Sequence, residues 1–411
     1  MGLLSQIIVQ ELSKIFYSID THLNDSRSRI LIVISMGWLL SIGIRLTYPV
    51  LLPYLRNDLG MSLSTAGLLL TLLWLAYAFG QLPGGILADK IGEGTTMVLS
   101  MVIAAGALSL VLASSSVLIL FVSTSILGFA VALFGVVRLT AIADVYPDKI
   151  GTAHGIMAAS GDIGNTILPP LAGIIAAATL WQFGFGMFIP AFTIVAIALW
   201  VVVPVRTSES KAVSNTLSLQ NIQKITTELR HPPITIITLI MTLNVTVIQS
   251  FIGFYPTYLN EMKGISAPLA SGIFAFFFIL GVLIKPLAGR GYDRSGAKRM
   301  IISLSSVSGF ALVCLVYSNN LLSIMAVTIL LSAMLGRGTI ALSYITAALS
   351  KDVQNTGLGI IRTFYFTVSA MGPLLFGIIA DRGFFDEAFL ILATLSGVII
   401  IFAVKLSPDK I

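Results

Sequence analysis

Four arginines and one aspartate occur inside long apolar stretches of the chain. The arginines are Arg45, Arg138, Arg337 and Arg362, and the aspartate is Asp162. An ionised side chain at the middle of a bilayer costs about 2.5–3.5 kcal/mol on insertion scales, so such residues serve function or pairing. A guanidinium presents its N–H groups as a planar fork that fits a carboxylate or a phosphate. If these stretches span a membrane, their excess of positive charge predicts a binding site for an anion.

Depth along the stretches separates these five residues. Arg45, Arg337 and Asp162 fall near the middle, which is where carriers bind substrate. Arg138 and Arg362 fall nearer one end, and that depth suits either substrate binding or a gate. The alternative is that each arginine pairs with a carboxylate and only holds helices together. Too few carboxylates lie inside the spans for that, so substrate binding is favoured for Arg45 above all.

The role of Asp162 is left open between two possibilities. It could pair with Arg45, Arg138 or Arg337, or it could carry a proton, because burial favours the protonated form of a carboxyl group. In the second case an anionic substrate would occupy the arginine partner, and the freed Asp162 would take up a proton. Substrate and proton would then load together, which is symport by linkage. Asp162 is therefore the candidate coupling residue.

Two uncharged polar residues are expected to complete the site. Tyr77 shares one helical face with Trp74 and Gln81. Gln249 stands at the position that corresponds to Arg45 in the internal repeat described below. For the other amides and aromatic residues of the spans, helix–helix hydrogen bonding is the better interpretation.

These residues must be held by membrane-spanning helices. The chain is 56% hydrophobic and 10% charged, whereas soluble domains carry roughly 25% charged residues. Apolar segments of about 20 residues predict an all-α membrane protein with twelve transmembrane helices in two pseudo-symmetric six-helix bundles. The predicted spans are 30–54, 63–87, 95–114, 117–143, 153–177, 182–204, 233–259, 267–289, 299–317, 322–348, 354–380 and 384–405.

The spans divide the chain into five predicted parts. These are an N-terminal segment at 1–29 with an interfacial amphipathic helix, bundles at 30–204 and 233–405, a linker at 205–232 and a tail at 406–411. Most lysines and arginines outside the spans lie on the side of both termini, because the opposite loops hold only Arg56, Lys263 and Arg382. The positive-inside rule therefore places the termini and the linker in the cytoplasm and the protein in the cytoplasmic membrane. The same bias accounts for the net charge of +6 without a nucleic-acid partner.

The two halves repeat at an offset of 204 residues. "GILADKIGEG" at 85–94 corresponds to "GRGYDRSGAKR" at 289–299, so that Gly85, Asp89 and Gly92 fall on Gly289, Asp293 and Gly296. After the fourth and tenth spans, Gly155, Pro169 and Gly173 fall on Gly359, Pro373 and Gly377 in the same register. Paired six-helix halves are typical of an alternating-access carrier.

The chain resembles the major facilitator superfamily over nearly its whole length. The loop signature G-x-L-A-D-R-x-G-R-[KR] of that family is approached twice, and the first copy departs from it at Glu93 and Gly94, where basic residues should stand. The resemblance implies the family's twelve-helix fold, and a gate formed by Gly85, Asp89, Gly289, Asp293 and Arg294 at the cytoplasmic side. Asp144, before "VYPDKIG", is expected to serve as a further cytoplasmic latch.

A finer resemblance involves the first span. Arg45 stands eight residues before Pro53, and "YAFGQLPGG" (77–85) and "YPTYL" (255–259) follow in the second and seventh spans. These features are similar to the anion:cation symporters and the organophosphate:phosphate antiporters. The resemblance implies a small organic anion as substrate and a proton or sodium as the coupling ion. We expect the carrier to be a monomer.

Other functions are disfavoured by what the sequence lacks. A single cysteine, Cys314, and three scattered histidines give no metal or redox cluster. There is no phosphate-binding loop and no set of catalytic residues, so we expect neither a cofactor nor an enzyme. A proton-driven drug or metabolite exporter is the alternative, although "ILPPLAG" lacks the glycine that exporters place before this proline. A non-transporting membrane sensor is a weaker alternative, because no large cytoplasmic domain is present.

Overall fold

The computed structural model describes residues 26–207, 231–349 and 354–406, and all regular elements in these ranges are helices. The first half contains α2 (Ser26–Leu59), α3 (Leu63–Ile91), α4 (Glu93–Leu112), α5 (Val117–Val145), α6 (Ile150–Ala178), α7 (Trp181–Gly186) and α8 (Phe188–Val202). The second half contains α10 (Pro232–Glu261), α11 (Ala267–Tyr317), α12 (Leu321–Leu331), α13 (Ala333–Ala348), α14 (Gln354–Ser369), α15 (Gly372–Asp381) and α16 (Phe385–Val404). The predicted interfacial helix and most of the predicted linker lie outside the described residues.

The helices match the predicted membrane spans. Ten helical segments of the described residues are long and apolar enough to cross a membrane. One of them, α11, has 51 residues and contains two predicted spans that meet at the non-helical Gly296. The more polar α6 accounts for the fifth predicted span, and α7–α8, α12–α13 and α14–α15 each form one span in two pieces. The all-α fold with two six-helix bundles is therefore confirmed.

The backbone carries the internal repeat. Gly60 and Gly264 have φ values of 61° and 66°, and Gly92 and Gly296 have φ values of 92° and 79°. The members of each pair are 204 residues apart. Gly60 and Gly264 lie in the turns that follow α2 and α10, Gly92 ends α3, and Gly296 interrupts α11. A side chain strongly disfavours such φ values, so glycine is needed at these turns. The two halves therefore turn back at equivalent places.

Each bundle is held by close helix contacts. In the first half, a Cβ added to Gly164 of α6 would lie 2.3 Å from the carbonyl oxygen of Leu39 on α2. A Cβ on Gly128 of α5 would lie 2.5 Å from the carbonyl oxygen of Leu73 on α3. Such approach of backbones is how membrane helices pack without help from the hydrophobic effect. These contacts position the faces of α2, α3 and α5 that carry the candidate site.

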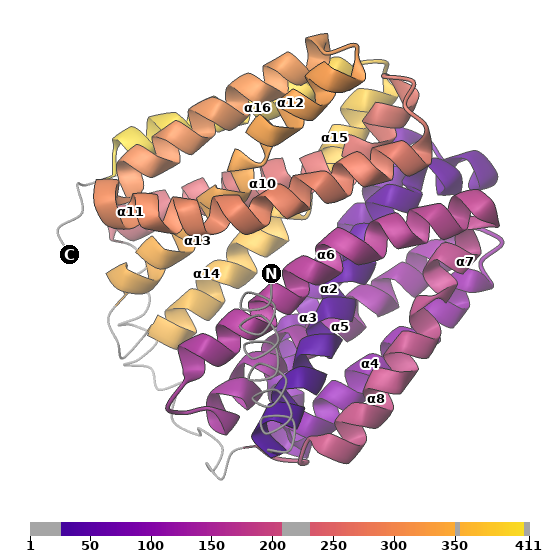
Figure 1. The fold of residues 1–411 in the computed structure, drawn as a ribbon, viewed down its shortest axis with the longest axis vertical. Coiled ribbons are helices and arrows are strands. Elements are labelled where there is room, and N and C mark those ends of the chain that lie inside the picture. The colour runs from indigo at the N-terminus through magenta and orange to yellow at the C-terminus, as the bar shows by residue number, and fades with distance from the viewer. Residues whose placement is uncertain (1–25, 208–230, 350–353, 407–411) are drawn as a thin grey trace, which may run out of the picture.

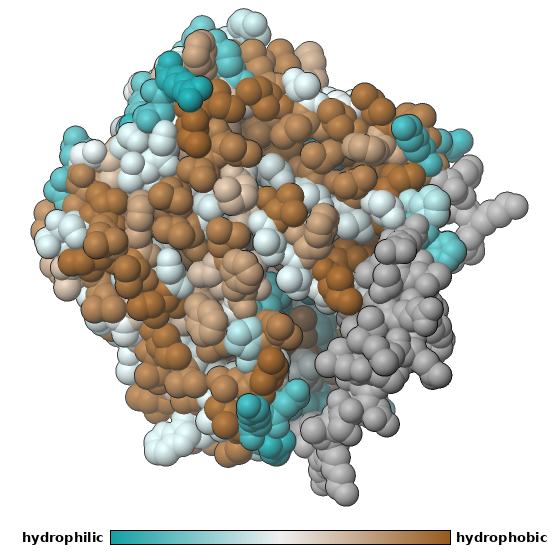
Figure 2. Space-filling view, turned by 180° about the vertical axis from the view of Figure 1, so that it is seen from behind, coloured by the Kyte–Doolittle hydropathy of each residue, from teal (hydrophilic) through white to brown (hydrophobic). Residues whose placement is uncertain are grey.

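The two bundles lie side by side, with α2–α8 at one side of Figure 1 and α10–α16 at the other. Apolar side chains dominate the surface in Figure 2, and polar ones gather toward opposite ends of the molecule. We call the end where α2 begins and α16 ends the N side, and the end of the α2–α3 turn the far side. The band between the two ends is the surface expected to contact lipid.

The bundles are joined along two seams toward the far side. In one seam, a Cβ on Gly67 of α3 would lie 2.4 Å from the carbonyl oxygen of Pro373 on α15. In the other, a Cβ on Gly173 of α6 would lie 2.8 Å from the hydroxyl of Ser271 on α11. Gly67 and Ser271 are 204 residues apart, so the two seams are related by the repeat.

The bundles separate toward the N side. Gly85, Gly155, Gly289 and Gly359 lie in the N-side halves of the helices that form the seams, and a Cβ on any of them would meet nothing within 4 Å. The close backbone contacts between the bundles therefore lie toward the far side, and these four glycines make no such contact at the N side.

Candidate functional site

The first element of the site is Arg45 on α2, which is 5% exposed. Its Nε–H donates to the carbonyl oxygen of Ser41 one turn earlier, at 3.0 Å. Its guanidinium carbon lies 4.1 Å from the ring centre of Tyr77 and 5.2 Å from that of Trp74, both on α3. The backbone contact and the rings hold the head group in place, and neither neutralises its charge.

Arg138 on α5 lies beside the same aromatic group. Its guanidinium carbon is 3.4 Å from the ring centre of Trp38, and the same ring is 5.6 Å from the guanidinium of Arg45. Its Nη1 contacts the sulfur of Met157 at 3.0 Å, and its buried Nε has no hydrogen-bond partner in the described residues. Trp38 therefore sits between two arginines from different helices.

Tyr77 links these residues to the second half. Its hydroxyl is hydrogen-bonded to the guanidinium of Arg45, and it lies within electrostatic range of Arg138 and of Arg362, the last of which lies on α14. Its ring is 5.9 Å from that of Phe366, also on α14. Three of the four predicted arginines thus lie within electrostatic range of one tyrosine at the interface between the bundles. In the described part of the chain none of the three forms an ion pair.

The second half adds two buried amides on α10. Asn244 and Gln249 are 1% and 3% exposed, and the side-chain oxygen and nitrogen of each lack a hydrogen-bond partner in the described residues. A buried amide left unpaired costs about 1–3 kcal/mol. Since α10 packs against α2, these groups are candidates for polar contacts with a bound molecule.

Arg337 does not join this group. It lies on α13, is 1% exposed, and its Nη1 donates to the hydroxyls of Ser305 on α11 and Ser396 on α16 at 3.5 and 3.4 Å. The guanidinium of Arg337 therefore points toward α11 and α16 within its own bundle and away from the first bundle. The structure therefore does not bring it together with Arg45, Arg138 and Arg362.

Asp162 pairs with none of the three arginines considered as its partners from the sequence. Its Oδ1 is 2.5 Å from Nζ of Lys285, so that an ion pair joins α6 of one bundle to α11 of the other. Both side chains are partly exposed, with 26% and 34% of their surface accessible. The charge on Asp162 is thus paired across the bundle interface.

The predicted gate residues lie at the N side. Asp89, Asp293 and Arg294 are exposed, and in the described residues neither carboxylate forms an ion pair. The Asp144 carboxylate accepts a hydrogen bond from the hydroxyl of Thr207 at 2.9 Å. A latch between the bundles at this side would close only when the N side closes, so it stays a prediction.

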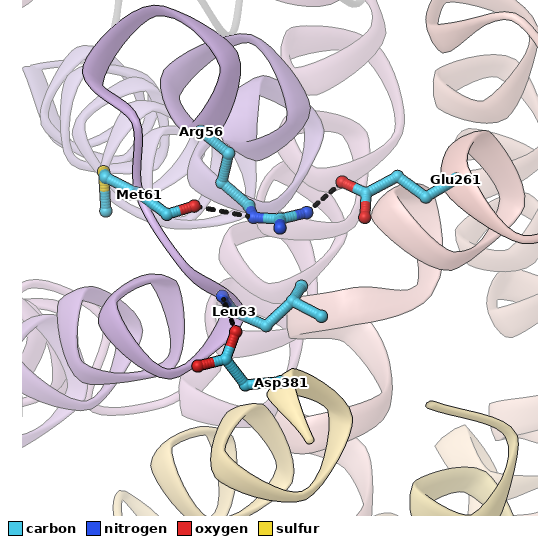
Figure 3. Close-up of polar contacts among 5 residues, drawn as sticks. All are labelled: Arg56, Met61, Leu63, Glu261 and Asp381. Atoms are coloured by element: carbon cyan, nitrogen blue, oxygen red, sulfur yellow. Dashed lines mark hydrogen bonds and ion pairs between the residues drawn. The ribbon is translucent and has the colours of Figure 1, made fainter. Parts of the chain in front are cut away.

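The far side carries a polar closure between the bundles (Figure 3). Arg56 of α2 forms an ion pair with Glu261 of α10, and its Nε–H donates to the carbonyl oxygen of Met61 at 3.2 Å. The Asp381 carboxylate of α15 accepts from the backbone N–H of Leu63 at 3.1 Å and from the hydroxyl of Ser64 at 2.7 Å. We call these contacts the far-side seal.

The sequence analysis missed Trp38 and Lys285 and the far-side seal. Trp38 stands seven residues before Arg45, which is two helical turns on the same face, so the spacing could have indicated it. The partners in the seal could not be found without knowing which ends of the bundles meet. In the described residues no group of three or more histidine, cysteine or acidic side chains could hold a metal ion.

Comparison with known proteins identifies a family and several proteins that this chain resembles. A family model described as Major Facilitator Superfamily matches residues 33–340 and 239–410. The hexuronate transporter of Bacillus subtilis (strain 168) is 24% identical over 390 residues, covering 82% of this chain and 85% of the relative. The solved nucleoside transporter NupG has a TM-score of 0.77 at 15% identity and covers 93% of this chain and 99% of its own. A bacterial homologue of the human lysosomal transporter Spinster, solved inward-facing and occupied, has a TM-score of 0.78 at 13% identity, with coverages of 92% and 96%. The structural likenesses at these identities show a shared fold.

Proposed function

Given that the chain belongs to the major facilitator superfamily and is therefore a multi-pass membrane transporter, we propose that its cargo is a small organic anion with a carboxylate. The observation that carries this proposal is the group of three arginines around Tyr77 at the bundle interface, without a described carboxylate among them. Cations gathered in a partly buried space repel one another, and a bound anion relieves that repulsion. An anion held between Arg45 and Arg362 would also contact both bundles, as alternating access requires.

The rest of the site supports a polyhydroxylated carboxylate of sugar-acid size. Trp38 and Trp74 flank the arginines with flat apolar faces, and such faces pack well against the C–H side of a sugar ring. The unpaired amides of Asn244 and Gln249 can both donate to and accept from hydroxyl groups. The similarity to a hexuronate transporter over most of the chain agrees with this class of substrate. No feature of the site favours the exporter alternative.

We further propose that the coupling ion is a proton carried by Asp162. Because Asp162 is paired with Lys285 across the interface, protonation would remove the negative charge that ties α6 to α11. The two bundles could then move apart or together at this seam. The positive-inside distribution of lysines and arginines supports a cytoplasmic N side, so the structure would represent the inward-open state of a carrier in the cytoplasmic membrane.

The substrate class is tested by the thermal stability of the purified protein in detergent. A ligand that binds only the folded state raises the melting temperature with its concentration. Hexuronates should raise it, and the corresponding neutral hexoses, which lack only the carboxylate, should not. Equal shifts with acids and neutral sugars, or a shift with neutral sugars alone, would reject the anion proposal.

The coupling role is tested with Asp162→Asn in liposomes. The variant should lose accumulation driven by a pH gradient and keep counterflow exchange, which needs no net proton movement. Lys285→Gln is the informative companion, because it breaks the same ion pair without removing the carboxylate. If Asp162→Asn still concentrates substrate when given only a proton gradient, in the absence of sodium, Asp162 is only a structural partner.

A further inference from the structure

The turn between α3 and α4 packs against residues 204–207, which follow the end of α8. The backbone N–H of Gly94 donates to the carbonyl oxygen of Val205 at 3.0 Å, and a Cβ on Gly94 would lie 2.2 Å from the carbonyl oxygen of Pro204. A Cβ on Gly92 would lie 2.1 Å from the carbonyl oxygen of Val205. Any larger residue at 92 or 94 would displace this segment, and that explains the glycine at 94, where the family signature has a basic residue.

The other departure from the signature, Glu93, has a partner in the same segment. Its side chain is 8% exposed, and its Oε2 accepts a hydrogen bond from the backbone N–H of Thr207 at 3.1 Å. The hydroxyl of Thr207 donates to Asp144 at the end of α5. One residue of the outgoing segment therefore binds two acidic side chains from two different helix ends, and a basic residue at 93 could not make this contact.

Arg206 brings a cation to the turn that lacks the basic residues of the signature at 93 and 94. One of its nitrogens, Nη2, donates to the carbonyl oxygens of Asp89 and Lys90, both at 3.1 Å. These carbonyls belong to the last turn of α3, where the unpaired C=O groups and the helix dipole favour a positive charge. The guanidinium also lies beside the residue that carries the predicted latch carboxylate, Asp89.

We propose that residues 205–207 form a clamp that takes over the role of the missing basic residues in the α3–α4 turn. The clamp fixes the N-side ends of α3, α4, α5 and α8 to one another. It also holds the Arg206 guanidinium at the last turn of α3, a helix that packs against α14 and α15 of the second bundle. When the N side closes, the end of α3 would approach the second bundle, and Arg206 would lie where the signature places its basic residues. The clamp therefore favours the N-side-closed, far-side-open state, and it controls how often the carrier changes state without touching the substrate.

The proposal is tested with Arg206→Gln, an exposed substitution that leaves the fold intact. Exposed charge contacts are worth little each, so the transport rate at saturating substrate should fall about two- to fivefold. The substrate affinity measured by thermal shift should stay unchanged. Arg206→Lys, which keeps the charge and can still reach a carbonyl, should restore much of the rate.

Lys90→Gln is the matched control. It removes one positive charge from the same turn, but the carbonyl oxygen of Lys90 that accepts from Arg206 remains. A cysteine at Ala370, on the far-side seam, reports the far-side-open state in a Cys314→Ser background. Arg206→Gln should lower its labelling by a membrane-impermeant maleimide added from the far side, and Lys90→Gln should not. If both variants behave alike in rate and labelling, or if Arg206→Gln weakens substrate binding as much as it slows transport, the clamp has no gating role.

Discussion

At the scale of single residues, the proposed site is built from guanidinium groups that are shielded from water, and aromatic rings lie against two of them. Arg45 has one hydrogen bond to backbone and three aromatic neighbours. The rings stabilise the cation, and Tyr77 is also hydrogen-bonded to it, but no carboxylate of the described residues pairs with it. A lysine in its place would keep the charge and lose the planar fork.

Arg45→Lys should therefore weaken binding of the anionic substrate about tenfold or more, which corresponds to roughly 1.4 kcal/mol. Thermal-shift titration of the purified variant measures this loss. Arg290→Lys, the same change at an exposed arginine of α11, should leave the affinity as it is. Native affinity in Arg45→Ala would remove Arg45 from the site.

Trp38 is expected to contribute through Arg138. A cation over an indole ring is worth about 0.5–2 kcal/mol, and the separation here is 3.4 Å. Trp38→Ala should lower substrate affinity about two- to thirtyfold, converted from that energy. Trp200→Ala, at a tryptophan that is 76% exposed, controls for the general loss of an aromatic side chain. An effect as large at Trp200 as at Trp38 would argue against a specific role.

The types of residue in the site could be read from the sequence, whereas their groupings could not. Arg45, Arg138 and Tyr77 follow from charge in apolar segments and from helical spacing. The position of Arg337 at the rear of its bundle depends on the rotation of α13 about its axis, which the contacts with Ser305 and Ser396 define. A charged residue in a helix surrounded by apolar residues on every side carries no pattern that would reveal this rotation.

At the scale of elements, the turns were easier to foresee than the helix breaks. The repeat predicted equivalent turns at Gly92 and Gly296, and both glycines have positive φ. The division of α14 from α15 at 370–371, and of α12 from α13 at Ser332, was not foreseen. The first break lies directly before Gly372 and Pro373, and a proline in a helix interior removes a backbone hydrogen bond, so this signal was present and was not used. The break at Ser332 has no glycine or proline beside it, so it depends on how the span bends around its neighbours.

Gly296→Ala should destabilise the protein by about 1–3 kcal/mol, because φ 79° and ψ 163° is a region that only glycine populates readily. The melting temperature of the purified variant measures the loss. Gly106→Ala is the control, because Gly106 lies within α4 with nothing within 4 Å of an added Cβ. There the substitution should be neutral or stabilise by up to about 1 kcal/mol. Equal melting temperatures of the two variants would contradict the strained turn.

At the scale of the whole molecule, the far-side seal opposes opening of that side. Its ion pair and the two hydrogen bonds to Asp381 cross between the bundles, so all of them must break before substrate can enter from the far side. If the carrier works by alternating access, as proposed above, their strength contributes to how long it stays in the state described here.

Asp381→Asn combined with Arg56→Gln should raise the far-side-open population severalfold, because exposed polar contacts of this kind are worth up to about 1 kcal/mol each. Labelling of a cysteine at Ala370 from the far side should rise accordingly. Neutralising the predicted latch with Asp89→Asn should lower the same signal. Unchanged labelling in the double variant would show that the glycine seams alone hold the far side closed.

The bond between Asp381 and the start of α3 also bears on how the protein is made. The N–H of Leu63 and the hydroxyl of Ser64 are synthesised 317 or more residues before the carboxylate that binds them. Ser62 gives α3 its own cap by accepting from the N–H of Thr65, so the helix can insert without waiting for Asp381. The remaining donors stay hydrated at the membrane surface until the last spans arrive from the ribosome. The second half can therefore complete its packing against the first only after residue 381 has been translated. A chain truncated before residue 381 would lack the Asp381 contacts at the start of α3.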